Sequence, residues 1–163
     1  MKKLFKPSSE ELLMLRTIAD FQFRYPGIGQ VLIPDNVLVE KSPNTLKIRG
    51  IYLDGKLIAA LRVNDNRLVL HCTGGRLIWN KIPKPRFRVY VVNEVRDFIS
   101  KGLNVFSRHV IDVDPEIRAG DEVIVVDEND NLLAVGRARL SAYEMLHFIR
   151  GEAVRIREGC IEC

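Results

Sequence analysis

Histidine, cysteine and acidic side chains are the groups with which catalysis or metal binding could begin in this chain. The three histidines are His71, His109 and His147, and they form neither an HExxH pair nor a recognisable nucleophile arrangement. The glycines are scattered and form no phosphate-binding loop. We therefore expect no catalytic residues and no cofactor, and the chain is predicted not to be an enzyme.

The segment that starts at Asp127 begins with the pattern of a calcium-binding loop. Asp127, Asn129 and Asn131 alternate as the first ligands of a calcium loop do. The same loop requires a glycine and a glutamate further on, where this chain has Leu132 and Ala138. The segment is therefore expected to be a polar hairpin turn.

The cysteines are the remaining candidates for metal or redox chemistry. Cys160 and Cys163 form a CxxC motif in the last four residues, whereas a thioredoxin-type pair lies where a strand meets a helix. A structural zinc site needs four ligands. Cys72 and His71 would complete such a set only if the C-terminal tail folded back onto the first half. Ordinary tail cysteines and no metal are expected, and a metal or disulfide role is the alternative.

Arginines at two-residue spacing point to a different chemistry, the binding of phosphate. Residues i and i+2 of a strand share a face, and the planar guanidinium matches phosphate geometry. Three such pairs occur: Arg86 and Arg88, Arg137 and Arg139, and Arg155 and Arg157. The segment 101–109 is a fourth basic place in the sequence. The alternative for each arginine pair is a solvated strand face balanced by nearby carboxylates.

Size and composition limit what can position these residues. The 163 residues suit one ordinary domain or two small ones and are too few for a (β/α)₈ barrel, which needs about 200. The hydrophobic share is 47% and the charged share 28%, as in globular proteins. The apolar runs are far shorter than the roughly 18 residues of a membrane helix. We expect a cytoplasmic protein with no membrane partner.

The charge is distributed unevenly along the chain. Residues 1–85 carry 14 lysines and arginines against 7 acidic residues, and residues 86–163 carry 11 against 14. A basic first half favours a polyanionic partner. In the second half, a nucleic-acid site must be a local arginine cluster because the overall charge there opposes binding.

The first half has the pattern of a helix followed by a small antiparallel sheet. Ser8-x-x-Glu11 is a capping box, and apolar spacing predicts a helix from residue 9 to about 24. The pattern becomes strand-like from Val31, and Asp54-Gly55 predicts a type I′ hairpin within a three-stranded meander over residues 45–71. A short helix is expected to follow.

The second half begins after two prolines and is rich in short strands. Pro83 and Pro85 lie between basic residues and mark the best domain boundary, which divides the chain into 1–84 and 85–163. A helix capped by Asn93 and stopped by Gly102 separates the first strand from VFSRHVIDVD, which we expect to be a second strand. At least five regularly spaced strands predict a small β-barrel.

The second half resembles a PUA domain, an RNA-binding module. The matching pieces are the NVF strand, the VDPEIRAGDEV turn, the LLAVGRA strand, the LSAYEM helix start and the RGEAVRIREG finish. The first-half stretches SSEELLMLRTIADFQF and TLKIRGIYLDGKLIAALRVNDNRLVLH resemble the C2 domain that precedes PUA in archaeal tRNA-guanine (archaeosine) transglycosylase. The resemblance implies an α+β chain: a helix-plus-antiparallel-sheet domain over 1–84 and a PUA-type β pseudo-barrel over 85–163.

The resemblance also implies which residues contact RNA. In PUA domains the groove between the first helix and the following strand holds RNA. Here Gly102 would let a phosphate approach the backbone, and Lys101 and Arg108 would supply positive charge. Asn104 would form a hydrogen bond with a sugar or base, and Phe106 would stack an unpaired base. Arg108 stands where the family usually has lysine. The candidate RNA-binding residues are Lys101, Gly102, Asn104, Phe106, Arg108, Arg137, Arg139 and Arg155.

The implied partner is tRNA or another structured RNA. The family places its aspartate and zinc chemistry on an amino-terminal barrel, for which this chain has no room. We therefore expect a stand-alone, non-catalytic module that holds the tRNA acceptor stem and CCA end in tRNA modification, with a separate catalytic transglycosylase-type subunit as a further partner. A translation-associated PUA factor and a protein-interaction module without RNA binding are the alternatives.

Overall fold

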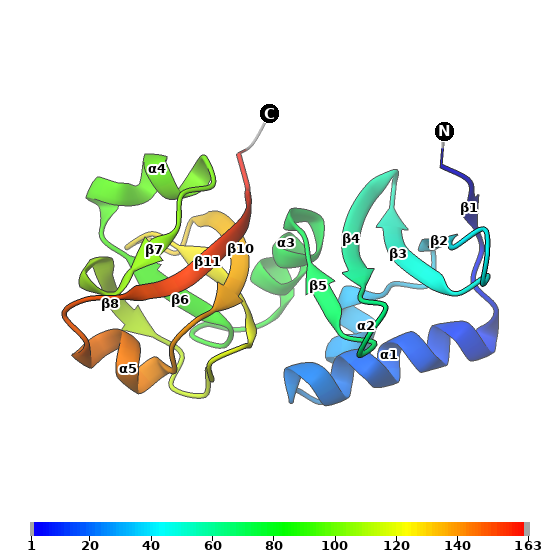
Figure 1. Cartoon of the computed structure of the whole chain (residues 1–163), viewed down its shortest axis with the longest axis horizontal. Coiled ribbons are helices and arrows are strands. Elements are labelled where there is room, and N and C mark those ends of the chain that lie inside the picture. Colours follow the sequence, from blue (N-terminus) through cyan, green and yellow to red (C-terminus); the bar gives the residue numbers. More distant parts are fainter. Residues whose placement is uncertain (1, 162–163) are drawn as a thin grey trace. The chain divides into compact units, whose positions relative to one another are not determined.

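The structure, a computed structural model, describes residues 2–161. The chain divides into two compact units, Met1–Ile78 and Trp79–Cys163, and each unit has its own sheet (Figure 1). The expected architecture, a helix-plus-antiparallel-sheet unit followed by a barrel-like unit, is confirmed. Within residues 2–161 no helix has both the length and the apolar character needed to cross a membrane.

The first unit contains a five-stranded sheet in which every neighbouring pair is antiparallel. Its strands, in spatial order, are β1 (Leu4–Phe5), β2 (Leu38–Lys41), β3 (Ile48–Leu53), β4 (Lys56–Leu61) and β5 (Leu68–Leu70). Asp54 and Gly55 have φ angles of 50° and 79°, as a type I′ turn requires. The predicted meander and its hairpin are thus confirmed.

The predicted first helix is α1 (Ser9–Phe23), and its capping box is present. The Ser8 hydroxyl accepts from the Glu11 amide at 3.1 Å, and the Glu11 carboxylate accepts from the Ser8 amide at 2.9 Å. A second predicted helix is also confirmed as α3 (Cys72–Lys81).

The strand-like pattern predicted from Val31 begins later than expected, at β2, because Val31 itself lies in the short helix α2 (Ile28–Leu32). Ile28 and Leu32, one helical turn apart, are both buried. A Cβ on Gly29 would lie 2.5 Å from the Arg16 carbonyl oxygen, so only glycine lets α2 approach α1 this closely. Tertiary packing therefore makes this apolar run helical.

The second unit contains a six-stranded sheet in the order β7-β11-β10-β9-β6-β8, antiparallel except for the parallel pair β6–β9. Its strands are β6 (Arg88–Val91), β7 (Val105–Phe106), β8 (Val110–Val113), β9 (Glu122–Val126), β10 (Leu132–Ala138) and β11 (Glu152–Gly159). Its helices are η1 (Asn93–Val95), α4 (Arg96–Ser100), η2 (Ser107–His109) and α5 (Ala142–His147).

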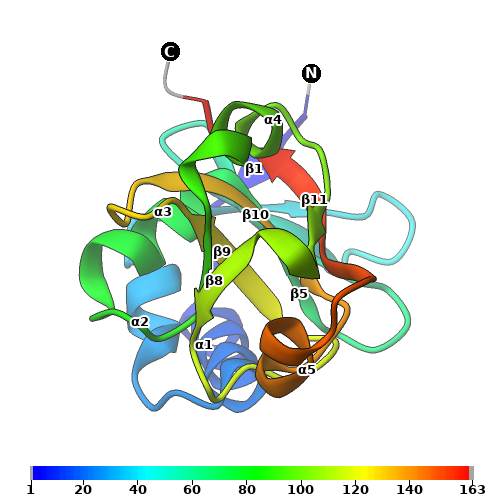
Figure 2. The same ribbon diagram turned by 90° about the vertical axis from the view of Figure 1, so that its left-hand side faces the viewer.

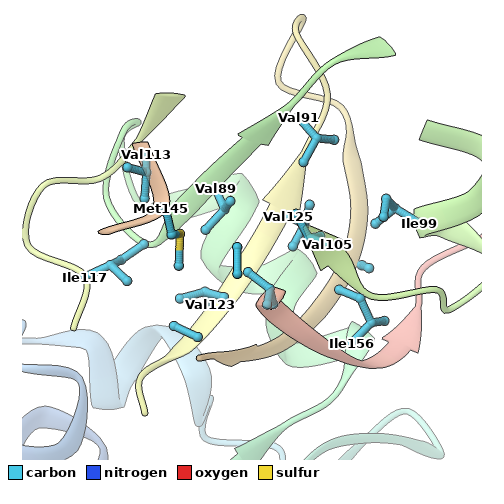
Figure 3. Close-up of a cluster of buried hydrophobic side chains, with 14 of the residues drawn as sticks. Val89, Val91, Ile99, Val105, Val113, Ile117, Val123, Val125, Met145 and Ile156 are labelled. Carbon is cyan, nitrogen blue, oxygen red and sulfur yellow. The ribbon is translucent and has the colours of Figure 1, made fainter. Parts of the chain in front are cut away.

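The core of this unit consists of apolar side chains that the curved sheet encloses. Val89 and Val91 of β6 meet Val123 and Val125 of β9, and Met145 of α5 joins them (Figure 3). The alternating apolar residues of these strands therefore provide the interior predicted for a small barrel.

Two local predictions for this unit are wrong. The stretch VFSRHVIDVD is interrupted by η2, so Arg108 and His109 lie on a 3-10 turn between two short strands. Asn93 is the first residue of η1 and does not cap it. Its amide oxygen instead accepts from the Glu128 amide at 3.2 Å. In both places a contact distant in sequence replaces the local pattern.

Arg86 and Arg88 lie inside the second unit and not on a solvated strand face. Arg86 is 8% exposed and forms an ion pair with the buried Asp114 at 2.6 Å. Arg88 is 2% exposed and forms an ion pair with Asp130 at 2.8 Å. This arginine pair is therefore structural and is excluded from nucleic-acid contact.

Asp127 fixes the turn between β9 and β10. One carboxylate oxygen accepts from the amides of Asn129 and Asn131 at 2.9 and 3.0 Å, and the other accepts from the Asn131 side chain at 3.0 Å. Burial alone would raise the pKa of Asp127, but the hydrogen bonds from Asn131 and Asn129 outweigh it, so the pKa lies below its ordinary value. The expected polar turn is confirmed, with its oxygens occupied by N–H donors.

We expect Asp127→Asn to lower the free energy of unfolding at pH 7 by about 1–3 kcal/mol, because buried donors lose an ionised acceptor. A depressed carboxyl pKa stabilises the fold above the unfolded value, about 3.9, and this contribution is lost as the pH falls through the folded pKa. Urea unfolding should therefore show a smaller difference in the free energy of unfolding between variant and wild type at pH 3 than at pH 7.

The control is Asp97→Asn, which changes an exposed carboxylate. An equal difference at both pH values, or the same loss of stability in the control, would contradict the role of the ionised Asp127 carboxylate in the turn.

Candidate nucleic-acid interface

The junction between α4 and β7 has the backbone geometry that the sequence predicts. Gly102 ends the helix with φ at 103°, in the left-handed region that favours glycine. The last residue of β11, Gly159, lies against this junction. A Cβ on Gly159 would be 1.9 Å from the Ser100 carbonyl oxygen and 3.1 Å from the Gly102 nitrogen. The close approach of two backbones thus fixes the junction beside β11.

Asn104 ties β7 to β11. Its amide oxygen accepts from the Ile156 backbone amide at 2.8 Å, and its nitrogen donates to Glu152 at 3.1 Å. The other oxygen of Glu152 accepts from Arg155 at 3.0 Å. Asn104 therefore uses both ends of its side chain within the protein, and we assign it to positioning the segment.

Three of the predicted contacts on this segment face solvent. Lys101, Phe106 and Arg108 are exposed, Phe106 with 44% of its surface. Neither cation forms an ion pair with any residue of the described range 2–161. Between Phe106 and Arg108, Ser107 is buried, and its hydroxyl has no partner in the described part of the chain. The segment therefore offers two unneutralised charges and one exposed ring.

A second group of predicted contacts lies on the neighbouring strands β10 and β11 and, for Arg139, directly after the end of β10. Arg137 pairs directly with Arg155 across the two strands. Arg137 and Arg139 are exposed whereas Gly136 and Ala138 are buried, so the expected sharing of one face is confirmed. The arginines border a cavity of about 280 Å³, lined by Arg137, Arg139, Arg155, Ile156 and Arg157.

The four arginines of this cavity differ in how far their charge is neutralised. Arg157 reaches the buried Glu122 of β9 with both terminal nitrogens, the longer contact being 3.0 Å. Arg155 forms an ion pair with Glu152 at 3.0 Å. Arg137 and Arg139 make no side-chain hydrogen bond or ion pair with any residue that the structure describes. The two charges of Arg137 and Arg139 are thus available to an external anion.

The strand order brings the two groups together. Because β11 lies between β7 and β10, the segment 101–108 and the arginine cavity occupy adjacent strands of one sheet. Clustered guanidinium and ammonium groups with an exposed ring suit a phosphate-bearing, base-bearing ligand. The range 2–161 has no group of three His, Cys, Asp or Glu side chains that could hold a metal ion, and Cys163 of the CxxC motif lies outside the described residues.

Sequence reasoning missed two features of this surface. The first is the pairing of Arg157 with Glu122, which no local spacing signals. The second is a stack of Tyr143 on His147, whose rings lie 4.0 Å apart between centroids at an angle of 17°. The i, i+4 spacing of this pair on a predicted helix is the signal that could have found it.

Two family models match the chain, one for each half. Residues 14–85 match the patch-forming domain C2 of tRNA-guanine transglycosylase, and residues 87–160 match the PUA domain. Together they account for both compact units.

Curated relatives of the chain are archaeal tRNA-guanine(15) transglycosylases. The protein of Thermoplasma volcanium is 44% identical over 155 residues, which cover 94% of this chain and 24% of the relative. That of Methanothermobacter thermautotrophicus is 42% identical over 150 residues, 92% of this chain and 23% of the relative. The chain thus spans about a quarter of the length of these relatives and matches their C-terminal region.

Solved structures show the same fold over nearly the whole chain. A hypothetical protein from Pyrococcus horikoshii has a TM-score of 0.74 at 21% identity, covering 99% of this chain and 96% of its own. A conserved PUA domain protein from Thermoplasma acidophilum has a TM-score of 0.68 at 21% identity, covering 98% and 95%. The chain therefore belongs to the PUA-domain proteins and carries, before its PUA domain, a C2 domain of the tRNA-guanine transglycosylase type.

Proposed function

We propose that this chain is a non-catalytic RNA-binding module that holds the acceptor stem and CCA end of tRNA. The observation that carries the proposal is the arginine cavity, in which Arg137 and Arg139 have no ion-pair or hydrogen-bond partner among residues 2–161. The cavity adjoins the segment 101–108, where Lys101, Phe106 and Arg108 are exposed. The C2 and PUA domains and the likeness to tRNA-guanine transglycosylases support RNA as the ligand.

Charge distribution is a further argument for a specific surface. Residues 86–163 carry more acidic than basic side chains. A polyanion must therefore bind where cations are both concentrated and unneutralised. Arg137, Arg139, Lys101 and Arg108 meet this condition. Phosphates that bind them displace water and counterions and do not have to break an internal ion pair.

The catalytic step belongs, in this proposal, to another chain. The relatives are named transglycosylases, and this chain matches only their C-terminal quarter. We propose that it acts in the cytoplasm and presents tRNA to a separate transglycosylase-type subunit. Co-purification with such a subunit would support this role, whereas co-purification with ribosomal subunits would favour a translation-associated factor.

The first experiment compares the binding of the full chain to a tRNA with and without its CCA end over a series of salt concentrations. We expect tight binding that needs the CCA end and weakens steeply with salt, because phosphate contacts release counterions. Binding that ignores the CCA end would contradict the proposed site. Weak binding that does not change with salt would favour a protein-interaction module.

A single substitution tests the segment beside the cavity. Arg108→Ala is expected to weaken tRNA binding by about 1–3 kcal/mol, as the loss of a good charged contact does. The matched control is Lys56→Ala, which removes an exposed positive charge from the first unit. Filter binding at constant salt measures both. An affinity equal to that of the control would remove Arg108 from the interface.

A further inference from the structure

The surface around α5 has more exposed apolar side chains than folding requires. Ala142 and Met145 anchor the helix in the core. Large apolar groups remain outside on the helix and on the chain that leads to β11: Tyr143 at 69% exposure, Leu146 at 47%, Phe148 at 45% and Ile149 at 84%. Several large apolar side chains exposed within seven consecutive residues mark an interaction site more often than a neutral surface.

Two rings within this area are already stacked. The Tyr143 and His147 centroids are 4.0 Å apart with an interplanar angle of 17°. His147 Nδ1 lies 2.8 Å from the Tyr143 carbonyl oxygen, which holds the imidazole in this orientation. Tyr143 stays largely exposed despite the stack. A flat, oriented pair of rings is therefore available to a third planar group.

Basic side chains flank the rings in the sequence, and β8, against which α5 packs, adds the exposed carboxylate of Asp112. Arg139 precedes α5, Arg150 follows it, and Arg108 lies on η2; all three are exposed and form no ion pair within the described range 2–161. Glu144 is the one carboxylate between residues 139 and 151, and it accepts from the Ser141 amide at 2.9 Å. Apolar rings bordered by free guanidinium groups match nucleotides, which combine flat bases with phosphates, better than they match an apolar protein face.

The ring pair adjoins the candidate interface. Helix α5 packs against η2 and β8 on the side that faces the viewer in Figure 2. The Ser107 amide donates to the Gly151 carbonyl at 2.9 Å, and Phe106 pairs with Glu152 across β7 and β11. The residues that follow α5 thus lie directly beside Phe106 and Arg108.

We propose that Tyr143 and His147 form a stacking platform for unpaired nucleotides at the single-stranded end of the bound RNA. The proposal rests on the proposed function and adds the residues that bind the unpaired part. Each base has a π face, so such a platform accepts different bases, while Arg108, Arg139 and Arg150 bind the phosphates between them.

The test uses the full chain and two RNA hairpins, one blunt and one with a short single-stranded 3′ extension that contains 2-aminopurine. Tyr143→Ala is expected to weaken binding of the extended hairpin about tenfold. It should also reduce the stacking-dependent quenching of 2-aminopurine and leave the blunt hairpin unaffected. Tyr143→Phe keeps the ring and should behave as the wild type.

The matched control is Phe21→Ala, which removes an aromatic ring that is 86% exposed on α1 of the first unit and should change neither affinity. An equal loss on both hairpins, or no loss on either, would overturn the platform. If the wild type prefers the extended hairpin and Tyr143→Ala does not alter that preference, the platform fails while the proposed function stands. If the wild type binds neither RNA, both fail. Self-association that Tyr143→Ala abolishes without changing RNA affinity would assign the surface to a second copy and would also overturn the proposal.

Discussion

Replacing Arg88 by methionine is expected to lower the free energy of unfolding by about 3–5 kcal/mol, the range for breaking a buried ion pair from one side. The Arg88 guanidinium is the donor for Asp130 at 2.8 Å, for the carbonyls of Ile82 and Arg86 at 3.0 Å each, and for the Trp79 carbonyl at 2.9 Å. Methionine fills similar space but donates no hydrogen bond. The buried carbonyls would therefore lose their partner without regaining water.

Urea unfolding followed by the fluorescence of Trp79, the single tryptophan, measures this loss. The Trp79 indole donates to the Asp130 carbonyl at 2.7 Å, so the signal reports on the same site. Arg88→Lys should give an intermediate value, because an ammonium keeps the charge but lacks the planar fork. The control is Arg118→Ala, at an exposed arginine of the same unit. Its free energy of unfolding is expected to stay within about 0.5 kcal/mol of the wild-type value. A similarly small change in Arg88→Met would refute the structural role.

The elements that the sequence predicts well are those with a local physical cause. The capping box at Ser8, the hairpin at Asp54-Gly55 and the helix stop at Gly102 each satisfy a backbone requirement with neighbouring residues. Strands β9 and β10 follow from their apolar composition. These signals, together with the family resemblance, are enough to predict the two-unit architecture.

The predictions that fail depend on contacts between residues distant in sequence. Helix α2 is helical because it packs on α1 through Gly29. The strand expected through Arg108 is broken where the Ser107 amide bonds to Gly151. Arg88 looks like a surface residue in the sequence and is buried because carbonyls and Asp130 converge on it. No local spacing contains this information.

The same distinction applies to the candidate site. Spacing predicts that Arg137 and Arg139 share a face, and the alternation of buried Gly136 and Ala138 with exposed Arg137 and Arg139 confirms it. The same spacing makes Arg155 and Arg157 equally good candidates for phosphate binding, yet Glu152 neutralises Arg155 and Glu122 neutralises Arg157. Which arginines can receive a phosphate is therefore decided by the partners that the fold supplies, and only the structure distinguishes the two pairs.

The double variant Arg137→Ala/Arg139→Ala is expected to weaken tRNA binding by about 2–4 kcal/mol, because two charge-assisted phosphate contacts are lost. The plot of log affinity against log salt should become shallower by about 1.5, since each phosphate contact contributes roughly 0.7–0.9 to its slope. Stability should change by less than about 0.5 kcal/mol, because both side chains are exposed and unpaired in the described structure. Fluorescence anisotropy over a salt series and urea unfolding measure these quantities.

The control for charge is Lys6→Ala/Lys56→Ala, which removes two exposed positive charges from the first unit and should leave the salt slope nearly unchanged. The contrast within the cavity is Arg157→Ala. It would leave the buried carboxylate of Glu122 without this partner, so we expect a loss of stability that makes any loss of binding ambiguous. If the double variant bound tRNA as tightly as its lysine control, the arginine cavity would not be the phosphate site. Free charge, and not the mere number of arginines, thus selects the pair whose removal should affect binding without affecting the fold.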